Sequence, residues 1–362
     1  MINKRAPITP ITASGDSFTV GHALGQASAR PFRNRVMATE EFKQLQQRWL
    51  NSSYLDQLEA AARATFPQFV VELEGMAAGA ELDFKTVFAW NCRGDLRLPE
   101  EVSAREMADA TDGCTTLLIP GDQTSGKPAV IAHNEDGAPE FLGGCFWVTV
   151  TPDDGTPYQS FMYPGMLPGH TIGVNARGLV QTINNVRVHD LKPGIPRQII
   201  CRAVLNSQTL DDAVSVLGRE DRASGFHHNL GCAGDHRLLS VEAPASGCDV
   251  TQIKQPAAHA NHLITNTFKD TAQEITRSSD TRQARSTELV TNPSSDLTKP
   301  EQLLFDRSDK SQVVFRDRDG GDDYGATLTT GVFEIYPDHV DWTLHGSENE
   351  LSVISGTTHV TT

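Results

Sequence analysis

The residues best suited to chemistry are a cysteine that begins one strand-like run and two polar residues that end the next. Cys114 opens a run rich in Thr, Leu and Ile (115–119), and a second apolar run (128–133) leads directly to Asn134 and Asp136. A short polar segment containing glycine separates the two runs, which predicts an antiparallel hairpin. This hairpin should bring Cys114 close in space to Asn134 and Asp136.

Cleavage of the Gly113–Cys114 peptide bond would give Cys114 both a thiol and a free α-amine. Such an amine, with a pKa of about 7.7–8.0, can accept the thiol proton, so one residue would supply nucleophile and base. The alternative is that Cys114 is a small residue that begins a buried strand, because free cysteines are often buried. The dipeptide alone favours that alternative, whereas its surroundings favour cleavage.

Composition limits the classes of protein that this chain represents. It has 362 residues, 38% hydrophobic and 21% charged, with a net charge of −15, which argues against a nucleic-acid or anionic-membrane partner. No run approaches the roughly 20 apolar residues of a spanning helix, and the first residues lack the apolar region of a signal peptide, so we expect a cytoplasmic protein. The six cysteines form no C-x-x-C pair, which argues against a disulfide framework or a four-cysteine zinc site.

Hydrophobic periodicity changes along the chain at Cys114. Helical spacing dominates residues 39–91, and the polar stretch 96–113 is typical of an exposed linker. Strand-like runs dominate afterwards. We therefore predict a mainly helical segment, 1–113, followed by a β-rich part, 114–362.

The β-rich part contains hairpins, then two helices, more strands, and more helix. Hairpins are expected at 145–163 and 170–184, helices at 196–206 and from Thr209, strands between 229 and 264, a helix at 281–290, and a final hairpin at 325–344. This order predicts an α+β protein in which two antiparallel sheets lie face to face with helices outside, a four-layer αββα sandwich.

Six short motifs, in order along the chain, resemble those of one family. They are Gly21–Gly25; Asn91, Arg93 and Asp95; Asp112–Thr116; Asn134 and Asp136; Asn261 and His262; and Gly325–Thr327. Together they resemble the N-terminal nucleophile (Ntn) hydrolases of the acyl-coenzyme A:6-aminopenicillanate (isopenicillin N) acyltransferase group, which includes carcinine-type amide hydrolases.

The resemblance implies autocatalytic cleavage between Gly113 and Cys114, with the α and β fragments remaining associated. It implies Cys114 as nucleophile, and Asp136 and Asn261 as the residues that orient the active centre and stabilise the oxyanion. Without the resemblance, the sequence would indicate only that Asn261 caps a turn at a strand end and that Asp136 is a turn residue. Further residues are expected to support the site: Thr115, Thr116, Asn134, Arg93 and His262.

The expected reaction is cleavage of a linear amide through an acyl-thioester on Cys114. The substrate would be an N-acyl amine, an N-acyl amino acid or a small peptide; the alternative is an acyltransferase that passes the acyl group to an amine. Neither cofactor nor metal is expected, since no phosphate loop occurs. The expected partners are the small-molecule amide and the two fragments, and a homo-oligomer is left open. Asp323-Tyr324 replaces the Ser-Arg pair of the penicillin enzyme, and Pro244 stands near one of its serines, which implies a different pocket.

Three other interpretations compete with this one. A metal could bind His227, His228, Cys232 and Asp235, but the spacing matches no common zinc pattern and neighbouring strand residues face opposite ways. A cysteine protease without self-cleavage could use Cys114, His262 and Asn261, although two adjacent residues cannot easily face one thiol from a single strand. The third interpretation is a non-catalytic binding protein.

Overall fold

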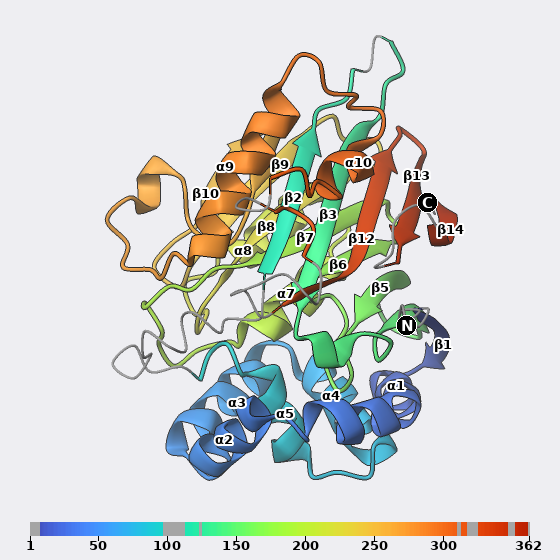
Figure 1. The fold of residues 1–362 in the computed structure, drawn as a ribbon. Coiled ribbons are helices and arrows are strands. Elements are labelled where there is room, and N and C mark those ends of the chain that lie inside the picture. Colours follow the sequence, from blue (N-terminus) through green and yellow to red (C-terminus); the bar gives the residue numbers. More distant parts are fainter. Residues whose placement is uncertain are drawn as a thin grey trace, which may run out of the picture.

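The structure, a computed structural model, describes residues 8–96, 113–122, 125–309, 313–316, 325–346 and 352–360. A group of N-terminal helices adjoins two β-sheets that pack against each other (Figure 1). Helices and strands are both present in quantity, so the predicted α+β class is confirmed. Most of the expected linker, and the pair Asp323-Tyr324, lie outside the described residues.

The N-terminal helices begin where capping residues predict. Thr39 and Ser52 accept hydrogen bonds from the backbone N–H groups of Phe42 and Leu55, which fixes the beginnings of two helices. Pro67 opens a third, as expected for a residue without an N–H. The helical segments are α1 (Ser17–Pro31), a π-helical turn (Phe32–Val36), α2 (Glu40–Trp49), α3 (Ser53–Thr65), α4 (Pro67–Gly79) and α5 (Phe84–Asn91).

Glycines bring α1 and α4 into backbone contact. A Cβ atom at Gly21 would lie 1.9 Å from the carbonyl oxygen of Glu72, and one at Gly25 would lie 2.1 Å from that of Met76. Helix α1 begins at Ser17, upstream of both glycines. The first motif of the resemblance therefore lies inside a helix and permits close helix packing.

Two sheets make up the rest of the chain. The eight-stranded sheet has the order β1 (Thr9–Gly15), β4 (Phe146–Pro152), β5 (Tyr158–Met162), β6 (Ile172–Asn175), β7 (Leu179–Asn185), β8 (Phe226–Cys232), β9 (Leu238–Ala243), β10 (Asp249–Gln252). The six-stranded sheet has the order β11 (Ala257–His259), β2 (Gly113–Ile119), β3 (Ala129–Gly137), β12 (Ala326–Ile335), β13 (His339–His345), β14 (Ser352–His359). β1 runs parallel to β4, and the other named strands pair antiparallel.

The predicted hairpins are confirmed, and three differences concern the sheet edges. β1 and β14 were not expected; the first is mostly exposed and both pair with only one neighbour, so neither shows the apolar pattern of a central strand. The strand expected over 259–264 ends at His259. Asn261 therefore follows the strand and lies in a connecting segment.

Side chains that alternate along β2 and β3 separate two apolar regions. Leu118 and Ile131 contribute to the large core shared by the two sheets, whereas Leu117 and Val130 pack on the opposite face with Val290. The helices of that outer face are α9 (Arg277–Thr291) and α10 (Pro300–Leu304), and the eight-stranded sheet contacts α7 (Arg197–Leu205) and α8 (Leu210–Leu217). Figure 1 shows α9 and α10 lying across β2, β3 and β12.

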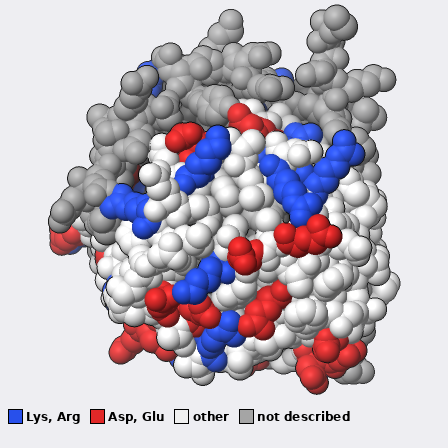
Figure 2. All heavy atoms as spheres, turned by 90° about the horizontal axis from the view of Figure 1, so that it is seen from below, with Lys and Arg blue, Asp and Glu red and all other residues white. Residues whose placement is uncertain are grey.

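No helix among the described residues is both long enough and apolar enough to cross a membrane. On the face seen in Figure 2, below the N-terminal helices, acidic and basic side chains are interspersed. Pairs on these helices include Arg63 with Glu59 at 2.8 Å and Lys85 with Asp56 at 2.5 Å. Over the described part of this face, neither sign of charge forms a continuous patch.

Candidate active site

Cys114 lies directly opposite Glu135 in the β2–β3 pair. Residues opposite each other in an antiparallel pair point to the same face, and the Cys114 Sγ atom is 3.3 Å from Glu135 Oε2. Asp136 is opposite Gly113, and Asn134 is opposite Thr115. The hairpin therefore brings the predicted strand ends together, but it is Glu135, between the two predicted polar residues, that shares a face with the thiol.

Two further side chains contact Glu135. The Tyr163 hydroxyl donates a hydrogen bond to Glu135 Oε1, and His133 Nε2 lies 3.2 Å from Oε2. Cys114, His133 and Glu135 are all buried. Burial lowers the pKa of His133 to about 3, so its imidazole is neutral at pH 7.

The thiol of Cys114 is protonated in this arrangement. Burial raises its pKa well above the ordinary value, and the negative charges of Glu135 and Asp136 raise it further, while the Arg282 guanidinium opposes them. A separate base is therefore needed if this thiol is to attack a carbonyl group.

The backbone of Cys114 is fixed by Asn261 and Arg282. Its N–H donates to Asn261 Oδ1 at 2.9 Å, and Arg282 donates to its carbonyl oxygen at 2.5 Å. Arg282 also donates to Asn261 Oδ1 at 2.7 Å and to Thr115 Oγ1 at 2.9 Å. The predicted residue Asn261 thus meets Cys114 at its nitrogen, the atom that cleavage would turn into an amine.

Asn261 and His262 point to different partners. Asn261 Nδ2 donates to the Asn185 carbonyl oxygen at 3.0 Å, and the Asn261 N–H donates to Ser279 Oγ at 2.9 Å. His262 Nδ1 lies 2.8 Å from the same Ser279 Oγ. His262 thus supports the segment that carries Asn261 and does not pair with the thiol, so its ring does not form the Cys–His arrangement of the alternative protease interpretation.

Asp136 lies beside the residue that precedes the nucleophile. It accepts a hydrogen bond from Thr327 Oγ1 at 2.7 Å, and its Oδ2 is 3.9 Å from an Arg316 nitrogen. A Cβ atom at Gly113 would lie 2.9 Å from nitrogens of both Arg282 and Arg316. The Gly113–Cys114 bond is therefore flanked by two guanidinium groups and a carboxylate, and the close contacts favour glycine at 113.

Two expected supporting residues have other structural partners. Asn134 donates to the Leu304 carbonyl oxygen at 2.8 Å and accepts from Thr330 at 2.5 Å, on the face opposite the thiol. Thr116 Oγ1 lies 2.7 Å from His133 Nδ1 and so belongs to the network behind Glu135. Asn134 thus anchors strand β3 to its neighbours.

The Asn91–Asp95 motif supports the wall of the site. Asn91 binds the backbone of Gly165 and Leu167 at 2.9 and 2.8 Å. Asp95 is fully buried and accepts hydrogen bonds from Ser224 and from the Arg197 N–H, so this motif is not a solvated charge cluster. Burial raises the pKa of Asp95, against the opposing effect of Arg197.

Arg93 forms no ion pair with Asp95 or Asp136. One of its nitrogens lies 2.8 Å from Met166 Sδ, and its guanidinium is 4.6 Å from the centre of the Trp90 ring. Arg93 also lines the cavity beside Cys114. It is therefore a wall residue of the cavity beside the thiol.

A small cavity of about 20 Å³ adjoins the thiol, lined by Cys114, Glu135, Tyr163, Asn185 and other residues. The Asn185 amide is oriented by Arg197, which donates to its Oδ1 at 3.0 Å. Asn185 Nδ2 is buried and has no hydrogen-bond partner among the described residues. This donor can therefore serve a group that enters the cavity.

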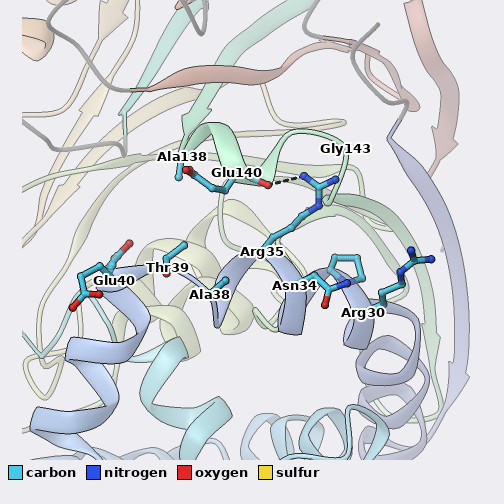
Figure 3. Close-up of a pocket in the computed structure, with 11 residues that line it drawn as sticks. Arg30, Asn34, Arg35, Ala38, Thr39, Glu40, Ala138, Glu140 and Gly143 are labelled. Atoms are coloured by element: carbon cyan, nitrogen blue, oxygen red, sulfur yellow. Dashed lines mark hydrogen bonds between the residues drawn. The ribbon is translucent and has the colours of Figure 1, made fainter. Parts of the chain in front are cut away.

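A larger hollow lies elsewhere in the described structure, between α1, α2 and the 3₁₀ turn Pro139–Phe141 (Figure 3). Its volume is about 1140 Å³, and Arg35 bridges its walls by donating to the Glu140 carbonyl oxygen at 2.8 Å. Cys114 does not line it. The residues that can react therefore line the small cavity and not this larger hollow.

The metal cluster considered for β8 does not form. His227 Nε2 lies 2.7 Å from Ser240 Oγ, and its ring stacks on that of His259 at 3.3 Å. Asp235 pairs with Arg237 at 2.6 Å. The described residues that do bring Cys, His and Glu donors together are Cys114, His133 and Glu135.

Several residues of the site, among them Glu135, Arg282, Tyr163 and Asn185, were not expected from the sequence. Glu135 could have been found from strand parity, because the hairpin places it opposite the nucleophile. Arg282, Tyr163 and Asn185 come from distant elements, and no local pattern connects them with Cys114.

Comparisons with known proteins point to one family. A sequence profile described as acyl-coenzyme A:6-aminopenicillanic acid acyl-transferase matches residues 122–349. The chain is 25% identical over 366 residues to the beta-alanyl-dopamine/carcinine hydrolase of Drosophila melanogaster, with 92% of each chain covered. It is 24% identical over 292 residues to the acyl-coenzyme A:6-aminopenicillanic-acid-acyltransferase 40 kDa form of Emericella nidulans, with 79% of this chain and 76% of that protein covered. The chain therefore belongs to the acyl-coenzyme A:6-aminopenicillanic acid acyl-transferase family.

Proposed function

We propose that this protein is a cysteine Ntn hydrolase that cuts its own chain before Cys114 and then cleaves a linear amide. The observation that carries the proposal is the position of Cys114 at the head of β2, with its nitrogen bound to Asn261 and its thiol beside Glu135. In this proposal the helices and sheets form the four layers of an Ntn αββα sandwich. The match to a carcinine hydrolase over nearly the whole chain supports an amide substrate.

Self-cleavage needs a base other than the Cys114 nitrogen. In the uncut chain that nitrogen is an amide, whose lone pair is delocalised, and it donates to Asn261. Glu135 Oε2, 3.3 Å from Sγ, accepts the thiol proton. The sulfur then attacks the Gly113 carbonyl carbon, the C–N bond breaks, and the nitrogen takes up a proton. Water hydrolyses the resulting thioester, which leaves a carboxylate on Gly113 and a free amine on Cys114.

The new amine is the base of the second reaction. Its pKa of about 7.7–8.0 suits it to accept the thiol proton near neutral pH. The thiolate attacks the amide carbonyl, the protonated amine gives its proton to the leaving nitrogen, and water releases the acid from sulfur. The donors proposed for the oxyanion are the buried Asn185 Nδ2 and the second N–H of Asn261 Nδ2, whose first N–H binds the Asn185 carbonyl oxygen.

The two fragments would stay together after cleavage. β1 belongs to the N-terminal fragment and pairs with β4 of the other over seven residue positions, from Thr9–Phe146 to Gly15–Pro152. Buried residues on both sides of the cut, such as Leu24 and Val148, belong to one core. Separation would expose this apolar surface to water.

Transfer of the acyl group to an amine is the second candidate reaction. The similarity to the acyltransferase of Emericella nidulans supports it. Both reactions share the same thioester and differ only in whether water or an amine releases it. Hydrolysis is preferred because the carcinine hydrolase matches a larger share of this chain, 92% against 79%.

The test is substitution of Cys114 by alanine, with intact mass and amide hydrolysis measured on the same preparation. Both cleavage and hydrolysis of a panel of N-acyl amines and N-acyl amino acids should be lost, whereas Cys248→Ser should retain both. Cys248 is a matched control because it is a free, half-buried cysteine outside the site. Hydrolysis that survives in Cys114→Ala would overturn the proposal.

A further inference from the structure

Three donor atoms of different chemistry converge beside the nucleophile. Cys114 Sγ, His133 Nε2 and a Glu135 carboxylate oxygen all lie within 4.8 Å of one another. The separations to Glu135 Oε2 are 3.3 Å from sulfur and 3.2 Å from nitrogen. Ligands at zinc bond lengths in tetrahedral geometry are separated by about 3.4–3.6 Å, so only small movements would allow all three to bind one ion.

The outer contacts of His133 prepare its Nε2 atom to bind a cation. Thr116 Oγ1 donates its proton to Asn184 Oδ1 at 2.9 Å and accepts from Asn229 Nδ2 at 3.1 Å. Its remaining lone pair accepts from His133 Nδ1–H, at 2.7 Å. The Nε2 lone pair is then directed toward Cys114 and Glu135. Metal-binding histidines usually have their second nitrogen fixed in this way.

Glu135 resembles His133 in that one of its side-chain atoms binds a neighbouring side chain while the other is turned toward the cluster. The Tyr163 hydroxyl binds Oε1, so Oε2 is the oxygen turned toward sulfur and imidazole. Hydrogen bonding of the second oxygen is the usual support of a metal-binding carboxylate. The adjoining cavity, about 20 Å³, has room for one water as a fourth ligand.

The geometry points to a reversible inhibitory site for a thiophilic divalent cation of the Zn²⁺ class, formed by Cys114, His133 and Glu135. A thiolate, a neutral imidazole and a carboxylate are zinc ligands, whereas Mg²⁺ and Ca²⁺ prefer sites made of oxygen alone. Binding displaces the thiol proton and places the sulfur electron pair on the metal, so the nucleophile is blocked. The three side chains are present in the cut and the uncut chain, so the site does not depend on the proposed self-cleavage.

Cobalt(II) tests the site without an activity measurement. Purified protein freed of metal with a chelator is titrated with CoCl₂, and the thiolate-to-cobalt charge-transfer band and the visible bands of tetrahedral cobalt are recorded. One equivalent per chain should produce both, and ZnCl₂ should abolish them. The charge-transfer band should be absent in Cys114→Ala, and His133→Gln should weaken cobalt binding by about 10- to 100-fold or more.

Matched controls are Cys248→Ser and His236→Gln, a half-buried cysteine and an exposed histidine outside the cluster. Both should bind cobalt like the unsubstituted protein, and circular dichroism should confirm that every variant is folded. A charge-transfer band that persists in Cys114→Ala, or that never forms in the unsubstituted protein, would overturn the inference. Amide hydrolysis is a separate readout: micromolar ZnCl₂ should inhibit it and a chelator should restore it. Absence of hydrolysis with a normal cobalt band would instead count against the proposed function.

Discussion

Cys114 and Glu135 face each other across the β2–β3 pair, with sulfur 3.3 Å from carboxylate oxygen. The relationship follows from the register of the hairpin, in which Gly113 pairs with Asp136 and Cys114 with Glu135. It gives the thiol an acceptor while the Cys114 nitrogen is still part of a peptide bond. In the proposed mechanism Glu135 is the base for chain cleavage, and the amine that cleavage would release is the base for amide hydrolysis.

Glu135→Gln should leave the chain uncut. Glutamine retains the size of the side chain and an acceptor for Tyr163 but is not a base, so cleavage should slow by about 10²-fold or more. A time course of intact mass after expression measures this, with the exposed Glu140→Gln as control. Cleavage of Glu135→Gln at the rate of the control would exclude Glu135 as the base.

Asn261→Ala should impair catalysis more strongly than substrate binding. The variant loses the acceptor for the Cys114 N–H and a donor available to the oxyanion, so kcat should fall by roughly 10²–10³-fold with little change in KM. Steady-state kinetics on the best amide of the panel check this. The exposed Asn292→Ala should behave like the unsubstituted protein, and an unchanged kcat in Asn261→Ala would contradict the assignment.

Acid should destabilise the fold through buried neutral histidines. Burial, with a smaller effect of Arg222, lowers the pKa of His228 to about 3. The unfolded chain, with a histidine pKa near 6.5, therefore binds more protons between about pH 6.5 and pH 3, and stability falls as pH falls through this window. Between pH 7 and pH 5 this one group should cost about 2 kcal/mol.

Urea unfolding of His228→Gln at both pH values measures the contribution of that histidine. The loss of unfolding free energy between pH 7 and pH 5 should be smaller by about 2 kcal/mol than in the unsubstituted protein. A cost of the substitution that is the same at both pH values cancels when the two losses of unfolding free energy are compared. The contributions of buried acids such as Asp95 cancel as well, because both proteins contain them. An equal loss in both proteins would show that His228 is not buried as a neutral group.

Gly25→Ala should destabilise the N-terminal helices. The new Cβ would lie 2.1 Å from the Met76 carbonyl oxygen, so α1 and α4 must move apart, at a cost of about 1–3 kcal/mol. Thermal unfolding should reveal a lower Tm, whereas Ala27→Ser on an exposed position of α1 should change it little. An unchanged Tm in Gly25→Ala would mean that the two helices are not in backbone contact.

Local sequence patterns predicted the helices and hairpins, because these depend on interactions between residues close in sequence. Hydrophobic periodicity located the helical stretch 39–91, and glycine-containing turns located the central hairpins. Strands β1 and β14 were missed because edge strands need only one neighbour and carry no strong apolar alternation. Asn261 was identified only through the family resemblance, since its partners Cys114 and Asn185 are far away in sequence.

Only part of the site was predicted, because contacts between residues far apart in sequence leave no local pattern. Cys114 was correctly placed opposite the end of β3, but choosing Asn134 and Asp136 as its polar neighbours neglected the alternation of side chains along a strand. Arg282 reaches the Cys114 carbonyl from a helix 168 positions later, a contact that only tertiary packing creates.

Intact-mass analysis with N-terminal sequencing of active protein tests the central claim most directly. Two fragments, residues 1–113 and 114–362, with Cys114 as the new N-terminal residue, are the predicted result. Amide hydrolysis by a chain of 362 residues with an unbroken Gly113–Cys114 bond would contradict it.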